Sequence, residues 1–183
     1  MKKLFFLLLV VCITNTSIAQ NTKDSADGRF HDDLLDHLAG TWHITSVAHG
    51  FSSTGVITAA WILNHQFFQL HFTGNDTIPW WHMPMEFQVF IGYNHHKNRY
   101  HFHVISIEGD ADPSEGFGYA YRNGNEIKLV AKMSPDTSVI QRFTWQPATA
   151  TWTMQSKEEI GGKEGKEAFL KMKLEAVKPA ANK

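Results

Sequence analysis

Residues 66–73 read QFFQLHFT and residues 85–93 read MEFQVFIGY. In each segment the apolar side chains recur at every second position, so that Phe68, Leu70 and Phe72 share one face of the first segment. A period of two is typical of a β-strand that buries one face against a core. The two segments therefore predict strands of a sheet with an apolar interior.

Working outward from these segments, ten strand-like runs follow one another along the chain. No connection between them has the length and periodicity of a crossover helix, which predicts an antiparallel sheet with neighbour-to-neighbour pairing. Such a sheet closes into a barrel or splits into a two-sheet sandwich, and we favour the barrel. The runs span roughly 41–48, 56–63, 66–73, 85–93, 99–107, 116–122, 126–133, 137–146, 150–157 and 168–176.

A short helix is predicted before the first strand, over Phe30–Ala39. Asp32 favours its positive N-terminal end, and Leu34, Leu35 and Leu38 form one apolar face ahead of a terminating glycine. A helix of this length fits one end of a barrel as a plug. The expected fold is an all-β, antiparallel, ten-stranded barrel with a short N-terminal helix.

The first residues have the pattern of a secretory signal peptide. Lys2 and Lys3 precede an apolar run of ten residues, and Ser17-Ile18-Ala19 is a small-x-small cleavage site. The apolar run is too short to cross a bilayer of roughly 30 Å. We therefore expect an exported protein, periplasmic or extracellular, that has no membrane span once the leader is removed.

The expected organisation is a signal peptide over 1–19, a flexible arm over 20–29, one barrel domain over 30–177 and a disordered tail over 178–183. Removing the leader shifts the formal net charge from −1 to −3, and no basic patch indicates a nucleic-acid partner. Cys12 leaves with the leader, so the mature chain has neither a disulfide nor a cysteine nucleophile. The oligomeric state is left open.

Four motifs follow the predicted helix in a fixed order: Gly40-Thr41-Trp42, the strand Trp61–Phe68, the turn Gly92-Tyr93-Asn94, and Arg142–Trp145 ahead of Thr151-Trp152. Over roughly residues 34–176 this order resembles the calycin superfamily of lipocalins, fatty-acid-binding proteins and nitrobindin-like barrels. It is most similar to the uncharacterised bacterial lipocalin-like families of domains of unknown function. The resemblance implies a calycin-like barrel that binds a small molecule.

Two features depart from these families. In lipocalins a late arginine often stacks on the first tryptophan; Arg142 is the matching residue for Trp42, but it falls on the eighth run rather than the last. Nitrobindin-like barrels ligate haem through a late histidine, whereas no histidine follows His103 here. The resemblance therefore implies no haem site, and the identity of any cofactor is left open.

All eleven histidines lie between His31 and His103. His101 and His103 share one strand face, and His71 lies on a neighbouring run, so the three are candidate metal ligands. The alternative is that these histidines line the barrel or lie on its surface. The segment Glu108–Glu115 is acidic enough to hold calcium, although it lacks the usual loop pattern and also fits a solvated hairpin loop.

No motif for nucleophilic catalysis or phosphate binding is present in the sequence, and no catalytic residue is assigned. The favoured function is a non-catalytic binding protein for a small apolar or amphipathic ligand in a barrel cavity. The alternatives are a metal-dependent enzyme or metal-binding protein, and a cavity-free interaction module. The candidate ligand-binding residues are Trp61, Phe68, His71, Trp80, Trp81, Met85, His101, His103 and Tyr119.

Overall fold

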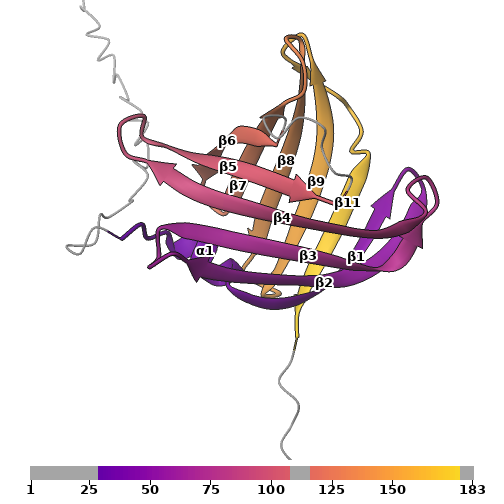
Figure 1. Cartoon of the computed structure of the whole chain (residues 1–183), viewed down its shortest axis with the longest axis horizontal. Coiled ribbons are helices and arrows are strands. Elements are labelled where there is room, and N and C mark those ends of the chain that lie inside the picture. Colours follow the sequence, from indigo (N-terminus) through magenta and orange to yellow (C-terminus); the bar gives the residue numbers. More distant parts are fainter. Residues whose placement is uncertain (1–28, 108–115, 178–183) are drawn as a thin grey trace, which may run out of the picture.

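The computed structural model describes residues 29–107 and 116–177, which form a closed antiparallel β-barrel with one short helix (Figure 1). The closed barrel of ten strands confirms the fold predicted from the strand periodicity and excludes the sandwich. The elements are α1 (Asp33–Leu38), β1 (Gly40–Ala48), β2 (Phe51–Ile62), β3 (Phe67–Ile78), β4 (Met83–Asn94), β5 (Arg99–Ser106), β6 (Phe117–Asn123), β7 (Glu126–Lys132), β8 (Thr137–Gln146), β9 (Thr151–Ile160), β10 (Lys163–Glu164) and β11 (Leu170–Ala176).

The strands follow the barrel wall in chain order from β1 to β9, and β11 lies between β9 and β1. The pairing of β8 with β9 closes the ring. In Figure 1, β2 to β5 run across the view, and β7, β8, β9 and β11 stand roughly upright behind them. The two-residue strand β10 pairs only with β9, so it is not one of the ten strands that close the barrel.

Strand β3 is longer than the periodicity predicts, because the expected end at residue 73 is followed by further pairing to Ile78. Gly74, Asn75 and Asp76 are poor strand formers, but a register shift between Thr73 and Thr77 absorbs them as a bulge. Asp76 accepts hydrogen bonds from the backbone N–H (2.6 Å) and the hydroxyl (2.9 Å) of Thr54. These bonds attach the bulge to β2.

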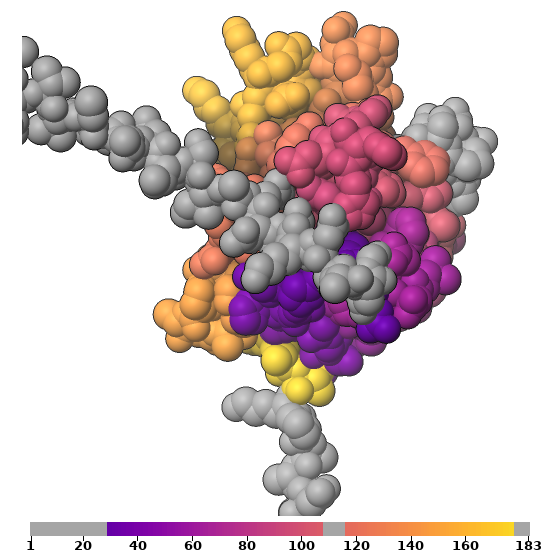
Figure 2. Space-filling model, turned by 90° about the vertical axis from the view of Figure 1, so that its left-hand side faces the viewer, coloured from indigo at the N-terminus to yellow at the C-terminus, as the bar shows by residue number. Residues whose placement is uncertain are grey.

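Helix α1 is shorter than predicted and begins after Asp32, whose carboxylate accepts hydrogen bonds from the backbone N–H groups of Leu34 and Leu35, both at 2.9 Å. This is an N-cap, the contact that satisfies the unpaired donors of a helix start. Leu34, Leu35 and Leu38 are at most 2% exposed and belong to the main hydrophobic cluster. The helix fills one end of the barrel, as predicted, and Figure 2 shows this end with the indigo N-terminal residues near its centre.

Both ends of α1 are held by side chains from the barrel. At the start, the buried carboxylate of Asp32 also accepts hydrogen bonds from the Tyr100 hydroxyl and from Nη1 of Arg122, the latter at 3.2 Å. At the end, the indole N–H of Trp42 donates to the carbonyl of Leu38 (2.8 Å), and that of Trp152 donates to the carbonyl of His37 (3.3 Å). The barrel thus completes the hydrogen bonding that a short helix leaves open at its termini.

Arg142 does not stack on Trp42, so the role implied by the resemblance to lipocalins is wrong for this residue. Alternation along β8 turns Phe143 and Trp145 toward the core and Arg142 outward, where its guanidinium forms two hydrogen bonds of 2.6 Å with Glu164. Trp42 instead packs edge-to-face against Trp145, with ring centroids 6.4 Å apart.

Several predicted segments lie outside the described residues. They are the signal peptide over 1–19, almost all of the arm over 20–29, the acidic segment Glu108–Glu115 and the tail over 178–183. Among the residues that the structure does describe, no helix combines the length and apolar content needed to cross a bilayer.

The Asp32 network gives a stability prediction. Asp32→Ala is expected to lower the free energy of unfolding by about 3 kcal/mol, because it removes the helix cap and the buried acceptor of the hydrogen bonds from Tyr100 and Arg122. Asp33→Ala is the matched control, since Asp33 also binds Arg122 but is 70% exposed, and its loss is expected to stay below about 1 kcal/mol. Urea denaturation at neutral pH measures both; equal losses would contradict a dominant role for the buried carboxylate.

The Arg142–Glu164 pair predicts a pH dependence. Its hydrogen bonds hold the pKa of Glu164 below the ordinary value of 4.5. A carboxylate with a lowered pKa in the folded state stabilises the fold above its unfolded pKa, and this contribution disappears as the pH falls through the folded pKa. In Glu164→Gln the free energy of unfolding should therefore fall less on acidification than in the wild-type protein. The difference should stay below about 1 kcal/mol, since the side chain is 27% exposed. Arg142→Gln should flatten the curve equally in acid denaturation series, and unchanged curves would contradict the pairing.

Candidate functional site

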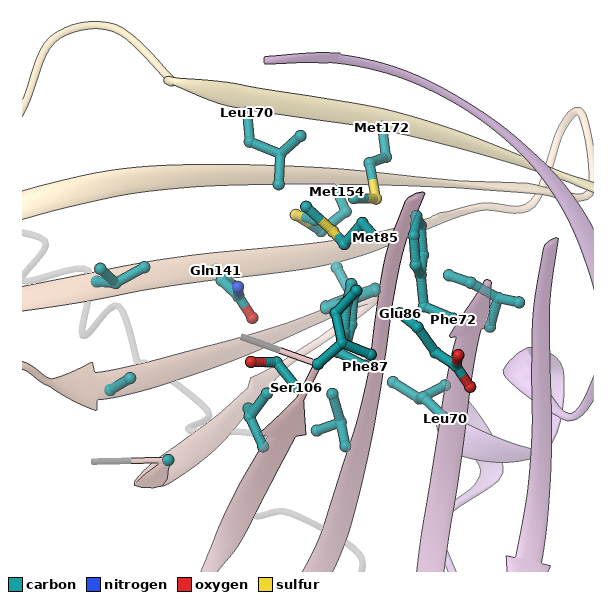
Figure 3. A pocket seen from close by; sticks show the side chains of 18 of the residues that line it. Leu70, Phe72, Met85, Glu86, Phe87, Ser106, Gln141, Met154, Leu170 and Met172 are labelled. Atoms are coloured by element: carbon teal, nitrogen blue, oxygen red, sulfur yellow. The ribbon is translucent and has the colours of Figure 1, made fainter. Parts of the chain in front are cut away.

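The half of the barrel opposite α1 encloses a cavity of about 290 Å³. Helix α1 packs at the starts of β1, β5 and β9, whereas the cavity lining includes residues at the opposite strand ends, among them Ser106, Met133 and Leu170. Its walls are mainly apolar, and Figure 3 shows Met85, Met154 and Met172 gathered near Phe72. The interior is therefore filled at one end and open to a small molecule at the other.

A smaller cavity of about 170 Å³ adjoins the first and shares five lining residues with it, Phe72, Trp81, Met85, Leu170 and Met172. Aromatic rings from three separate connections surround it. Trp80 contacts His49 and Phe51 edge-to-face, with centroids 5.7 and 6.1 Å apart, and His49 stacks on Phe169 at 5.9 Å. These rings form an aromatic rim at the open end.

Two polar side chains of the main cavity, Ser106 and Gln141, form no hydrogen bond with any described residue. Other inward serines are paired: Ser46 bonds Ser53 at 2.7 Å, and Ser156 donates to the sulfur of Met154 at 3.4 Å. In Figure 3 the polar ends of Ser106 and Gln141 lie on the same side of the cavity. They are available to hydrogen-bond a polar group of a ligand.

The charged lining residue Glu86 directs its carboxylate away from Ser106 and Gln141 (Figure 3). Oε1 of Glu86 lies 2.8 Å from Nε2 of His71 on the outer face of the barrel. Its carboxylate is thus already paired outside the cavity.

Three of the nine predicted ligand-binding residues lie at the cavities. Trp81 and Met85 line both of them, and Trp80 lines the smaller one while remaining 43% exposed. Trp61 and Phe68 lie at the helix end instead. Trp61 donates from its indole N–H to Asp36 at 2.8 Å, and Phe68 is fully buried in the core.

The other four predicted residues, His71, His101, His103 and Tyr119, lie on the outer face of β3, β5 and β6. On β5 the inward positions are taken by the buried Tyr100 and Phe102, so alternation turns both histidines outward. The ring of His101 packs edge-to-face on Phe67 (5.9 Å), that of His103 stacks on Phe117 (3.9 Å), and Arg99 lies 3.6 Å from the ring centroid of Tyr119. None of the four lines either cavity.

The three candidate metal ligands are separated by the sheet register. His71 is paired with Gln88 of β4, which is paired in turn with Ile105, whereas Gly92 of β4 is paired with His101. Strand β4 therefore lies between His71 and both histidines of β5. Across residues 29–107 and 116–177, no group of three histidine, cysteine or acidic side chains is placed to hold a metal ion.

His101 has a distinct environment within this outer face. Its Nδ1 is buried and has no hydrogen-bond partner among the described residues, and burial lowers the pKa of the ring. The ring lies over Gly92, where a Cβ atom would come within 2.9 Å of Nε2. This packing sets the ring against apolar neighbours, which disfavours its charged form.

Four lining residues were not predicted from the sequence: Ser106, Gln141, Met154 and Met172. The signal that finds them is the phase of strand alternation: an inward Phe143 and Trp145 require Gln141 to point inward, and an inward Trp152 requires the same of Met154. The largest apolar residues of each strand determine which alternate positions face inward. The predicted histidines lie at the other positions, on the outer face.

In comparisons with known proteins, the chain matches no protein-family model and no curated protein. Membership of the calycin superfamily therefore stays a proposal.

Filling the cavity should abolish binding of an apolar probe. Ala131→Phe adds a ring to the cavity wall from β7 and is expected to weaken binding of N-phenyl-1-naphthylamine by at least about tenfold. Lys132→Phe is the matched control, since it makes the same addition one residue later on the exposed outer face. Fluorescence titration measures both affinities, and an equal affinity in the two variants would place the probe elsewhere.

Proposed function

We propose that this protein is an exported, non-catalytic binding protein for one small apolar or amphipathic molecule, held in the barrel cavity. The observation that carries the proposal is the interior space of about 290 Å³, whose apolar wall includes two unpaired polar side chains. A barrel that acts only as an interaction module has no need of such a space. Ligand sites typically combine an apolar wall with a few polar groups that fix orientation.

The size of the cavity limits the ligand. Its volume of about 290 Å³ lies just below the roughly 300–1,000 Å³ that is typical of small-molecule sites. Each buried methylene contributes about 0.8 kcal/mol, so six of them supply about 5 kcal/mol. The unbranched side chains of Met85, Met154 and Met172 adapt to irregular shapes. These properties favour a compact or single-chain ligand.

The export part of the proposal rests on the leader over 1–19. The superfamily part rests on the ordered motifs from Gly40 to Trp152, to which the closed barrel and its helix plug add support. Periplasmic and extracellular locations both fit such a leader.

A metal-dependent enzyme has less support. The register separates His71 from His101 and His103, and all three lie outside the cavities. Ser106, Gln141 and Glu86, the polar side chains of the described main-cavity lining, form no hydrogen bonds with one another. Activation of a nucleophile requires an adjacent base, which this arrangement does not provide.

Native mass spectrometry tests the proposal on protein recovered after export with its own leader. The denatured mass is expected to correspond to residues 20–183, and the native mass to exceed it by one organic molecule. A sample stripped of this molecule should bind N-phenyl-1-naphthylamine with one site per chain.

The control is the stripped Ala131→Phe variant, which should bind the probe at least about tenfold more weakly than the stripped wild-type protein. A stripped wild-type protein that fails to bind the probe would overturn the binding function. A denatured mass that retains residues 1–19 would overturn the cleavage of the leader.

A further inference from the structure

The charges around the cavities limit the class of ligand they accept. Among the described residues, Glu86 is the charged side chain on the lining of the main cavity, and it is paired with His71 outside. The smaller cavity adds Asp76, whose carboxylate accepts two hydrogen bonds from Thr54. Neither described lining includes a lysine or an arginine.

Three arginines of the barrel wall are engaged at other places. Arg122 binds Asp32 and Asp33 at the helix end, Arg142 binds Glu164 on the outer wall, and Arg99 lies over the ring of Tyr119. A carboxylate or phosphate inside the cavity would therefore be buried without a counter-charge from the described wall. Burying an ion in this way costs several kcal/mol, which offsets the contribution of several methylene groups.

The unpaired polar groups favour an uncharged partner. The amide of Gln141 offers two donors and one acceptor, and the hydroxyl of Ser106 offers one donor and an acceptor. A hydroxyl, carbonyl or amide on a ligand satisfies such groups and carries no desolvation cost of an ion. The remaining wall at this level is formed by apolar side chains such as Val104, Val139 and Phe143.

We infer that the cavity selects uncharged, mainly apolar molecules that carry a single hydrogen-bonding group, such as a fatty alcohol or amide, and discriminates against fatty acids and cationic amphiphiles. This inference rests on the proposed binding function and specifies the chemistry of its ligand. Gln141 and Ser106 hold the polar group of the ligand, and the methionine and phenylalanine side chains hold its chain.

The test compares three decyl compounds of equal chain length, 1-decanol, decanoate and decyltrimethylammonium, as competitors of N-phenyl-1-naphthylamine on the stripped protein. A pH of about 8 keeps decanoate ionised. The expected result is that decanol binds at least about tenfold more tightly than either ion. Decanoate or decyltrimethylammonium binding as tightly as decanol would overturn the inference.

A pair of variants at one position sharpens the test. Gln141→Arg places a cation in the cavity and is expected to improve the affinity for decanoate relative to decanol by at least about tenfold. Gln141→Leu removes the amide without adding charge, so it should weaken decanol and leave decanoate a poor competitor. If Gln141→Arg fails to fold, the ranking of the three compounds on the wild-type protein decides the inference alone.

The two proposals fail in different ways. If the naphthylamine probe does not bind the stripped wild-type protein, the proposed function falls, and this inference falls with it. If the probe binds and decanoate displaces it best, the binding function stands and only the selection for uncharged ligands is overturned.

Discussion

The buried carboxylate of Asp32 accepts four hydrogen bonds, two from the first turn of α1 and one each from Tyr100 and Arg122. A buried carboxylate is tolerated only when its acceptor positions are filled in this way. Because these bonds hold the helix inside one end of the barrel, the large aromatic residues gather there, including Trp42, Tyr100 and Trp152. The opposite end is lined by Phe72, Trp81 and the flexible methionines Met85, Met154 and Met172, and the space that remains between them is the cavity.

The outer and inner faces of the barrel carry different kinds of side chain. Strand alternation sends the histidines of β5, the guanidinium of Arg142 and the carboxylate of Glu86 outward, where their partners are other surface groups. Around the main cavity, the inward side chains supply an amide, a hydroxyl, and apolar carbon and sulfur. A closed sheet makes this separation strict, since each strand has one inward and one outward side and no free edge.

Much of the fold could be predicted because strand periodicity is a local property. The alternation in QFFQLHFT, the helix before Gly40 and the absence of crossover helices were sufficient for a closed antiparallel barrel. The extension of β3 was missed because its bulge depends on Asp76 binding Thr54, 22 residues earlier. The cavity residues were harder to find, since Gln141 and Ser106 are ordinary polar residues until the inward face of each strand is known. The predicted site was placed on histidines instead, although the residues that face inward on β5 are their neighbours Tyr100 and Phe102.

The contacts that hold α1 join parts of the chain that are far apart. Asp32 is 68 residues from Tyr100 and 90 from Arg122, and His37 is 115 residues from Trp152. The hairpins of the wall, by contrast, join neighbours in the chain and close with little loss of loop entropy. During folding the helix has no complete binding site until β5, β6 and β9 are in place. The first described segment of the chain therefore completes its hydrogen bonds only when strands from most of the barrel are in place.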